Sequence, residues 1–198
     1  MPDMNAVGDL VLTDHPDAMR VLAAPLSLSI HDELRRGGAA SADELATRIR
    51  ASTDATRERL QELQVVGLVT SSEPPASGTQ PRWQACGKGF VFEIPDDPDG
   101  EAAARELSTA MVLYYVDLPR RWAIEDAPQL ELSWARAAGL LNAAVAITPD
   151  ELRDVQNGLE QLLERFINRD TAHVPAHARR VRILGYFMPV GDQRVRND

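Results

Sequence analysis

The sequence has little cysteine, little lysine and few aromatic residues. A single cysteine, Cys86, excludes a disulfide within the chain and is typical of a reducing compartment. Lys88 is the only lysine, and the resulting arginine bias is typical of GC-rich bacterial genomes. No hydrophobic run approaches the roughly 20 residues of a transmembrane helix, and the acidic N-terminus lacks the features of a signal peptide. We therefore expect a cytoplasmic bacterial protein that does not enter a membrane.

Motifs of catalysis are also missing from the sequence. It has no glycine-rich phosphate loop, no nucleophile elbow and no HExxH-type metal site. His173 and His177 have a spacing that suits a metal on a helix, but Pro175 lies between them and no third ligand is near. We therefore expect no catalytic residues, no metal and no cofactor, and we do not expect an enzyme.

The most informative stretch is residues 41–69, which has the pattern of two short helices joined by a tight turn. Ser41 and Glu44 form a capping box at the start of the first helix. Ser52 is placed to cap a second helix, which we expect over residues 53–64 with polar and basic side chains facing outward. A helix–turn–helix of this kind suits the major groove of DNA.

A pair of short strands is expected directly after the second helix. Residues 65–69 are β-prone, residues 71–80 have the composition of a loop, and residues 82–85 can form the returning strand. Two strands with a polar loop after a helix–turn–helix make a wing. We expect Trp83 to pack the wing onto the helices rather than to touch DNA.

The side chains that we expect to contact DNA come from the second helix and the wing. Arg57 and Arg59 are the expected main contacts, and Arg82 and Lys88 are expected to hold backbone phosphates. The alternative interpretation is an ordinary solvated helix face and ordinary surface charge. The predicted DNA-binding residues are Ser52, Thr53, Thr56, Arg57, Arg59, Gln61, Arg82 and Lys88.

Residues 13–94 resemble the ArsR-type winged-helix transcription regulators. The resemblance lies in AAPLSLSI at 23–30, in 41–49, in 60–69 with its glycine-leucine-valine ending, and in Arg82-Trp83. It implies a winged helix–turn–helix that binds operator DNA as a dimeric repressor-type protein. Metal-sensing members carry a cysteine pair in the first helix of the motif, which is absent here, so the resemblance does not extend to metal sensing. Arg57-Glu58 stands where many members have an aromatic or histidine residue, so their DNA sequence preference does not carry over.

The acidic balance of the chain opposes binding to DNA. The formal net charge is −9, and residues 41–94 carry six basic side chains against seven acidic ones. Non-specific affinity for DNA comes mainly from basic side chains that neutralise phosphates. A local basic strip on an acidic body can still bind, because phosphate contacts depend on the field within about 8–10 Å. We therefore expect a modest affinity that is strongly sensitive to salt.

The part of the chain after residue 94 is expected to be an α+β domain with long helices. The acidic, turn-rich sequence at 95–100 marks the boundary, and Thr148-Pro149-Asp150-Glu151 is a strong helix start. The aromatic residues of this half are candidates to line a pocket for a small-molecule effector. Over the whole chain, we expect helices at 15–23, 26–36, 101–118 and 149–168, and strands at 140–147 and 179–189.

The sequence thus predicts an α+β protein of two domains. Residues 1–94 form a winged helix–turn–helix that binds DNA, and residues 95–198 serve dimerisation and effector binding. The expected partners are double-stranded operator DNA, a second copy of the chain and a small-molecule effector. The alternative is a winged-helix protein–protein interaction module that does not bind DNA, which acidic side chains mixed throughout the surface would favour.

Overall fold

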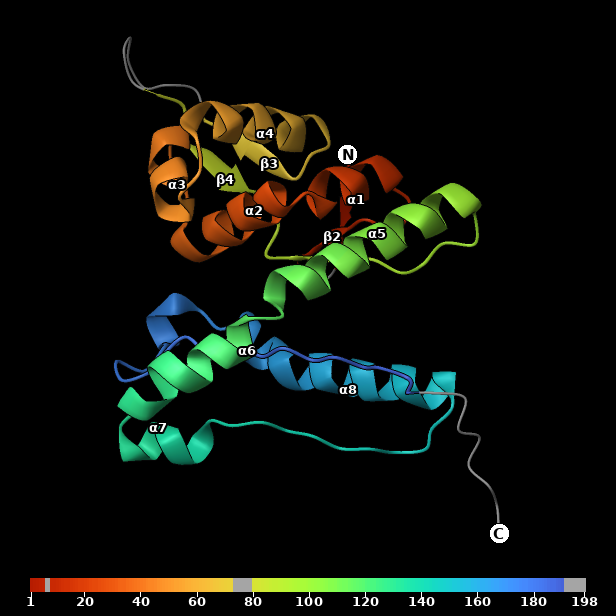
Figure 1. Cartoon of the computed structure of the whole chain (residues 1–198), viewed down its shortest axis with the longest axis vertical. Helices are drawn as coiled ribbons and strands as arrows, with labels where there is room; N and C mark the ends of the chain where they lie inside the picture. The colour runs from red at the N-terminus through yellow and green to blue at the C-terminus, as the bar shows by residue number, and fades with distance from the viewer. Residues whose placement is uncertain (6–7, 73–79, 191–198) are drawn as a thin grey trace. The chain divides into compact units, whose positions relative to one another are not determined.

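The computed structural model describes residues 1–5, 8–72 and 80–190 of the chain (Figure 1). Its architecture is mixed, with helices and two small sheets, and is compatible with a winged-helix fold. The chain divides into two compact units, Met1–Ala135 and Arg136–Asp198, which are described separately below.

The helices of the first unit follow the predicted pattern closely. The predicted helices at 15–23, 26–36 and 53–64 are confirmed to within about two residues. The helix predicted at 101–118 begins at Pro98, because the Asp97 side chain accepts a hydrogen bond from the Gly100 N–H (2.8 Å). The helices are α1 (Pro16–Ala23), α2 (Pro25–Gly37), α3 (Ala42–Ile49), α4 (Thr53–Val65), α5 (Pro98–Tyr115), α6 (Leu118–Arg121) and α7 (Leu132–Ala137), which crosses the boundary between the two units; α6 and α7 are joined by a π turn and a 3₁₀ turn.

Two small sheets complete the first unit. In one, β2 (Leu10–Val11) lies between β1 (Asp3–Met4), which is antiparallel to it, and β5 (Phe90–Val91), which is parallel. In the other, β3 (Val69–Ser71) and β4 (Trp83–Ala85) are antiparallel and form the predicted wing. The predicted first strand of the wing begins later than expected, at Val69, because α4 continues through Val65. The loop predicted at 71–80 lies mostly outside the described residues.

The core of the first unit joins the helices to both sheets. α3 and α4 pack against each other and both pack against α2, while α5 packs against α1 (Figure 1). Side chains that are fully buried in this core come from every one of these helices and from the strands, including Leu12, Met19, Leu22, Ile30, Leu45, Leu60, Leu63, Leu68 and Leu107. Burial of each such leucine contributes about 1.5–3 kcal/mol. The position of the second helix of the motif is therefore set by tertiary packing.

Helix α5 belongs to the first compact unit, although it follows the predicted domain boundary. The Arg20 guanidinium on α1 donates to the Asp99 carboxylate and, at 3.2 Å, to the Asp99 carbonyl oxygen. Leu107 on the same helix is fully buried in the core. The division of function between 1–94 and 95–198 stays a prediction, and the structure adds that α5 is anchored on α1.

The second unit is built around one long helix, α8 (Pro149–Ile167), followed by a 3₁₀ turn. The predicted capping box is present at its start. Thr148 Oγ1 accepts from the Glu151 N–H (3.2 Å), and Glu151 Oε2 accepts from the Thr148 N–H (2.7 Å). Together with the proline at the first helical position, this capping box explains why α8 starts here.

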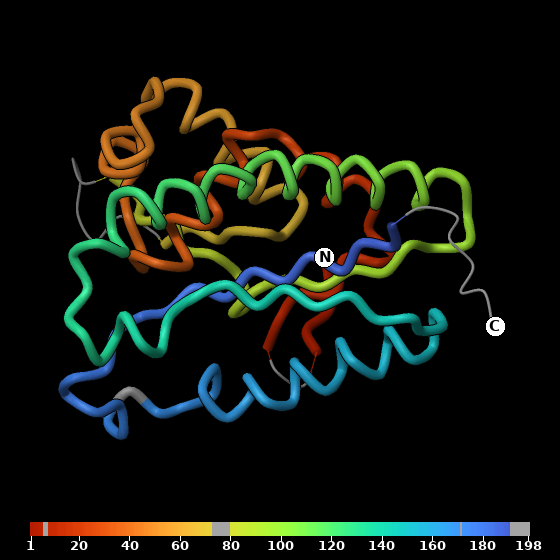
Figure 2. The backbone as a smooth tube through the Cα atoms, turned by 60° about the horizontal axis from the view of Figure 1, so that its bottom comes forward, coloured from red at the N-terminus to blue at the C-terminus, as the bar shows by residue number. Residues whose placement is uncertain are grey.

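The segments on either side of α8 differ from the prediction. Residues 139–148 and 178–190 are extended, as Figure 2 shows, but neither forms a β-ladder with any described residue. The sheet predicted for this half of the chain is therefore wrong for the described residues 136–190. The residue composition of these two segments favours an extended backbone. A β-strand also needs a neighbouring strand about 4.8 Å away with which to form hydrogen bonds.

Candidate nucleic-acid interface

The helix–turn–helix is set up by its caps and by one left-handed residue. At the start of α3, the Ser41 hydroxyl accepts from the Glu44 N–H (3.2 Å) and the Glu44 carboxylate accepts from the Ser41 N–H (2.8 Å). This backbone hydrogen bond holds the pKa of Glu44 below its ordinary value. At the other end, Arg50 has φ +56°, which reverses the chain within three residues and delivers Ser52 to the start of α4.

The capping box gives a first prediction for stability. Ser41→Ala removes the acceptor of the Glu44 N–H and should lower the free energy of unfolding by about 1 kcal/mol. A urea titration followed by circular dichroism measures this change. The control is Ser108→Ala within α5, where the hydroxyl only donates to the Ala104 carbonyl oxygen. We expect this control to leave stability unchanged or slightly raised, and an equal loss in both variants would contradict the capping role.

The first turn of α4 contains three of the predicted contacts, and one of them is placed differently from the prediction. Ser52 is exposed and caps the helix, its Oγ accepting from the Ala55 N–H (3.4 Å), and Thr53 is half-buried beside it. Thr56 is fully buried and its hydroxyl donates to the Ser52 carbonyl oxygen (2.8 Å). The expectation that Thr56 faces outward is therefore wrong, because this side of the first turn packs into the core.

The middle of α4 presents the two expected main contacts, each with an acidic neighbour. Arg57 is exposed and pairs with Asp54 (3.0 Å) and, across the motif, with Asp43 on α3 (4.0 Å). Arg59 is partly buried and pairs with Glu62 one turn later. Both acidic partners on α4 lie three residues from their arginine, the spacing at which helix side chains meet.

The remaining polar residue of the predicted set on α4 is Gln61, which is exposed. One turn further along, the Gln64 side chain donates to the Ser71 hydroxyl on β3 (3.1 Å). This hydrogen bond ties the end of α4 to the wing, so that the helix and the hairpin form one surface.

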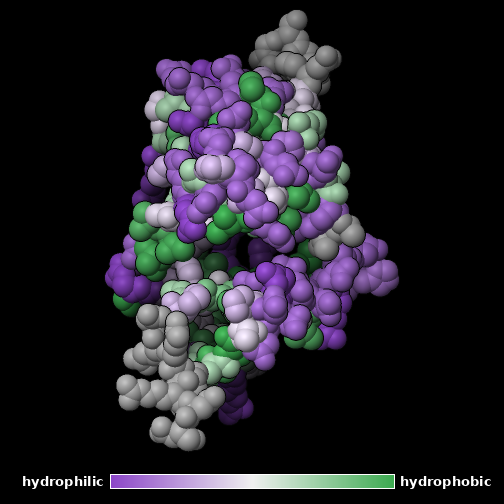
Figure 3. All heavy atoms as spheres, turned by 90° about the vertical axis from the view of Figure 1, so that its right-hand side faces the viewer, coloured by the Kyte–Doolittle hydropathy of each residue, from purple (hydrophilic) through white to green (hydrophobic). Residues whose placement is uncertain are grey.

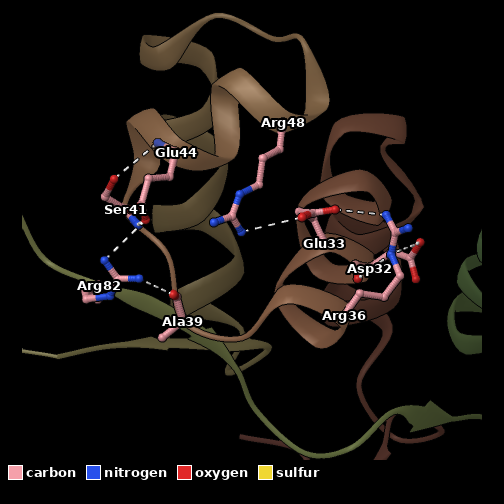
Figure 4. A network of polar contacts seen from close by, with 8 residues as sticks. All are labelled: Asp32, Glu33, Arg36, Ala39, Ser41, Glu44, Arg48 and Arg82. Atoms are coloured by element: carbon pink, nitrogen blue, oxygen red, sulfur yellow. Dashed lines mark hydrogen bonds and ion pairs between the residues drawn. The ribbon is translucent and has the colours of Figure 1, made fainter. Parts of the chain in front are cut away.

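The wing is anchored to the motif through Arg82, which Figure 4 shows, and through Trp83. Arg82 donates to the Ala39 carbonyl oxygen and pairs with Glu44 at 3.3 Å. The Trp83 side chain is buried, and its backbone exchanges hydrogen bonds with Ala40 (2.8 and 2.9 Å). The predicted packing role of Trp83 is confirmed, and the head group of Arg82 is occupied within the motif.

Lys88 lies in the turn between β4 and β5, not in the wing. Its backbone N–H donates to the Gly8 carbonyl oxygen (2.8 Å), and its carbonyl oxygen accepts from Arg35 Nε on α2 (2.6 Å). The structure thus places this residue beside β2 and the end of α2. The structure brings Ser52, Thr53, Arg57, Arg59 and Gln61 together on α4, but it does not put Lys88 in that set.

Acidic side chains are interleaved with the basic ones over the whole motif. Arg48 on α3 pairs with Glu33 on α2 (3.6 Å), and Glu33 also pairs with Arg36 (3.0 Å; Figure 4). With the pairs of Arg57, Arg59 and Arg82, this makes a mixed field and not a continuous basic strip. Asp43 is the residue that the sequence alone did not identify, since it meets Arg57 only because α3 and α4 pack against each other.

Cys86 and the spaced pair His173 and His177 do not form a reactive or metal-binding site in the described residues. Cys86 is half-buried, and burial raises the pKa of its thiol, which disfavours the reactive thiolate. His173 lies near the Asp170 carboxylate (3.2 Å) and is exposed. In the residues that the structure describes, no group of three or more histidine, cysteine or acidic side chains is placed to hold a metal ion.

Comparison with known proteins adds little to this geometry. No family model and no curated protein matches the sequence. Among the solved structures that match is a MarR family transcription regulator, with 16% identity over 77% of this chain and 74% of that chain, at a TM-score of 0.25. A likeness this low supports no argument, so the interpretation rests on the chain itself. Within the described residues, no helix is both long and apolar enough to cross a membrane.

Proposed function

We propose that the first unit binds double-stranded DNA through α4, as a dimeric winged-helix transcription regulator of repressor type. The observation that carries the proposal is the arrangement of α3, α4 and the wing around one core. α4 begins at an exposed capped end, presents Arg57, Arg59 and Gln61, and is tied to β3 through Gln64. Such a helix enters the major groove with its first turns toward the bases.

The ion pairs on α4 do not prevent such contacts. Exposed pairs between arginine and a carboxylate contribute only about 0–1 kcal/mol each, since water screens them. A DNA phosphate carries the same single negative charge as a carboxylate and also accepts two hydrogen bonds from arginine, so it can replace the carboxylate as a partner. Arg57 can therefore exchange Asp54 for a phosphate or a base edge at little cost to the fold.

A dimer follows from the size of the reading surface. One α4 covers only a few base pairs, and a two-fold pair of helices reads a palindromic operator about one helical turn apart.

The effector expected from the aromatic residues stays a prediction. Tyr114 and Tyr115 pack edge to face at 4.8 Å, whereas Tyr186 and Phe187 are exposed.

The first test is a salt series with the DNA upstream of the protein's own gene. For a dimer that makes roughly four to six phosphate contacts, the logarithm of the binding constant should fall with the logarithm of salt concentration, with a slope of about −3.6 to −5.4. Fluorescence anisotropy with a labelled intergenic fragment measures the slope. A scrambled fragment of the same composition gives the non-specific baseline.

The second candidate function is a protein–protein interaction module. The observation that favours it is the mixed field, in which Arg57, Arg59 and Arg82 each lie beside a carboxylate. Alternating charges give specific recognition of a complementary protein surface. Absence of any binding to DNA at low salt, by protein that is folded and dimeric, would favour this function over the regulator.

A further inference from the structure

Asp43, near the start of α3, contacts both elements of the proposed DNA interface. One oxygen of its carboxylate, Oδ1, lies 4.0 Å from Arg57 Nη2 on α4. The other oxygen, Oδ2, accepts a hydrogen bond from Gln80 Nε2 (2.5 Å). Gln80 belongs to the returning end of the wing, residues 80–82, which leads into β4. A single carboxylate therefore joins α3 to the second helix of the motif and to the wing.

Ion pairs as such are common on the surface of this protein. Figure 3 shows one face of the molecule, and hydrophilic side chains cover much of it. An exposed pair between arginine and a carboxylate contributes little to stability, so the contact of Asp43 with Arg57 alone assigns no role. The distinctive feature of Asp43 is that its two carboxylate oxygens contact two partners from two elements that are far apart in the sequence.

The guanidinium of Arg57 lies between two carboxylates. Its Nη1 pairs with Asp54 on the same helix (3.0 Å), and its Nη2 faces Asp43 across the motif. A guanidinium is planar, so contacts at both terminal nitrogens limit its rotation and fix its direction. A long side chain that is ordered before binding loses less conformational freedom when it meets its partner. Asp43 and Asp54 thus orient Arg57 before any DNA is bound.

The returning end of the wing is attached to the first turn of α3 by two neighbouring carboxylates. Asp43 accepts from Gln80, and Glu44 pairs with Arg82 at 3.3 Å, as Figure 4 shows for the second pair. The Ser72 N–H donates to the Arg82 carbonyl oxygen (2.9 Å), which continues the pairing of β3 with β4. The position of the wing therefore depends on the same turn of α3 that faces Arg57.

We propose that Asp43 is a positioning residue, which holds Arg57 and the returning end of the wing in one fixed relation, so that α4 and the wing meet DNA as a single preformed surface. The inference rests on the proposed function and adds to it a residue that determines specificity. An arginine of fixed direction favours the sequence whose base edges lie in its path, whereas a freely moving one binds any phosphate. The carboxylate of Asp43 also repels phosphates that approach Arg57 without that fit. Asp43 therefore raises the ratio of operator affinity to non-specific affinity.

Hydrogen exchange on the protein without DNA tests the link to the wing. In Asp43→Ala, the amides of Ser72 and Trp83 should exchange at least about five-fold faster, because the wing opens more often when one of its attachments is lost. The matched control is Asp54→Ala. Asp54 is also the second residue of its helix and also pairs with Arg57, but its carboxylate lies on α4 and not between α3 and the wing. This control should leave the exchange of both amides unchanged.

The conservative variant Asp43→Asn separates the wing from the arginine. Asparagine keeps an oxygen that can accept from Gln80, but it has no charge with which to hold the guanidinium. The wing amides should therefore exchange as in the unmodified protein. The order parameter of the Arg57 Nε–H group, measured by NMR relaxation without DNA, should fall because one of the two carboxylates no longer restrains it.

The same variant tests specificity when DNA is added. In Asp43→Asn, the ratio of the affinity for the upstream fragment to the affinity for the scrambled fragment should fall at least about five-fold. Fluorescence anisotropy measures both affinities, and thermal unfolding shows that each variant is folded. A merely structural role of Asp43 would leave this ratio unchanged in a variant whose wing stays protected.

The control for the loss of one negative charge is Glu58→Gln. Glu58 is exposed on α4 directly after Arg57, and adjacent residues on a helix do not face each other. The variant should raise both affinities by a similar factor and leave their ratio within a factor of about two.

Each part of the proposal can be overturned. Equal exchange of the wing amides in Asp43→Ala and Asp54→Ala would show that Asp43 does not hold the wing. An unchanged order parameter of Arg57 in Asp43→Asn, or the same affinity ratio in Asp43→Asn and Glu58→Gln, would show that Asp43 does not position the arginine. If the unmodified protein binds no DNA, the proposed function fails together with the role in specificity, and the two measurements without DNA still decide whether Asp43 holds α4 and the wing together.

Discussion

Replacing Arg57 and Arg59 together with alanine is expected to reduce operator affinity at least about 100-fold, because each arginine that contacts a base or phosphate contributes roughly 1–3 kcal/mol and a dimer carries each twice. The free energy of unfolding should change much less, since exposed ion pairs contribute little. Fluorescence anisotropy with the upstream fragment measures the affinity, and urea denaturation measures the stability.

The control for charge alone is Arg105→Ala. Arg105 lies on α5, is exposed, and pairs with Glu101 at 2.8 Å in the same way that Arg57 pairs with Asp54. This variant should change the operator affinity by no more than a factor of about two, because a surface substitution away from the binding face has only a small effect. Equal losses in the control and the double variant would mean that α4 does not read the DNA.

Removal of an acidic side chain beside Arg57 tests the same helix, with an expected rise in affinity instead of a fall. Asp54→Asn removes the carboxylate that lies 3.0 Å from Arg57 and releases the guanidinium for phosphate. Affinity should rise several-fold at low salt, because one negative charge leaves the binding face on each copy. A fall in affinity would show that Asp54 itself contributes to recognition.

Protonation of His31 is expected to destabilise the first unit as the pH falls from about 6.5 to 4. The side chain is 2% exposed on α2, it meets the Phe90 ring edge to face at 5.5 Å, and its Nε2 has no hydrogen-bond partner among the described atoms. Burial, together with the charge of Arg35, lowers the pKa of His31 to about 4. In this fold the imidazole is therefore neutral at neutral pH.

The sign follows from proton binding in the two states. Between pH 6.5 and 4 the unfolded chain holds a proton on His31 and the folded chain does not, so stability decreases as the pH is lowered. The loss contributed by this residue is about 2 kcal/mol at pH 5 and roughly 3 kcal/mol at pH 4. Urea titrations at a series of pH values measure it.

The matched variant is His31→Leu, which keeps an apolar body of similar size and cannot titrate. The difference in unfolding free energy between the variant and the unmodified chain should shift in favour of the variant by about 2 kcal/mol from pH 7.5 to 5. Carboxylates titrate in both proteins and cancel in this difference. Parallel pH profiles would show that His31 is protonated, or exposed, in the folded protein.

The main helices of this protein were predictable because side chains close in sequence cap their ends. The boxes Ser41–Glu44 and Thr148–Glu151 satisfy the free N–H groups of the first turn with side chains three residues away. The order of helix, turn, helix and wing follows from the same local rules. The candidate residues Ser52, Arg57, Arg59 and Gln61 were found in this way.

Other parts of the site depended on packing that no local pattern contains. Thr56 reads as a surface residue of a polar helix, yet it is buried because α4 turns that side toward the core. Asp43 lies within 4.0 Å of Arg57 although 14 positions separate them. Lys88 was expected at the wing, and the strand order β1-β2-β5 places it beside β2 instead.

The sequence by itself determined where the capped helices α3, α4 and α8 start, which segments are extended, and which helix carries arginine on an open face, because capping, propensity and periodicity act over a few residues. Only the tertiary structure decided which side of α4 is buried, which carboxylates accompany its arginines, and that α5 packs with α1. It also decided that residues 139–148 and 178–190 find no ladder within the described chain. These outcomes depend on contacts between distant segments, and a hydrophobic pattern states that a face must be covered without stating what covers it.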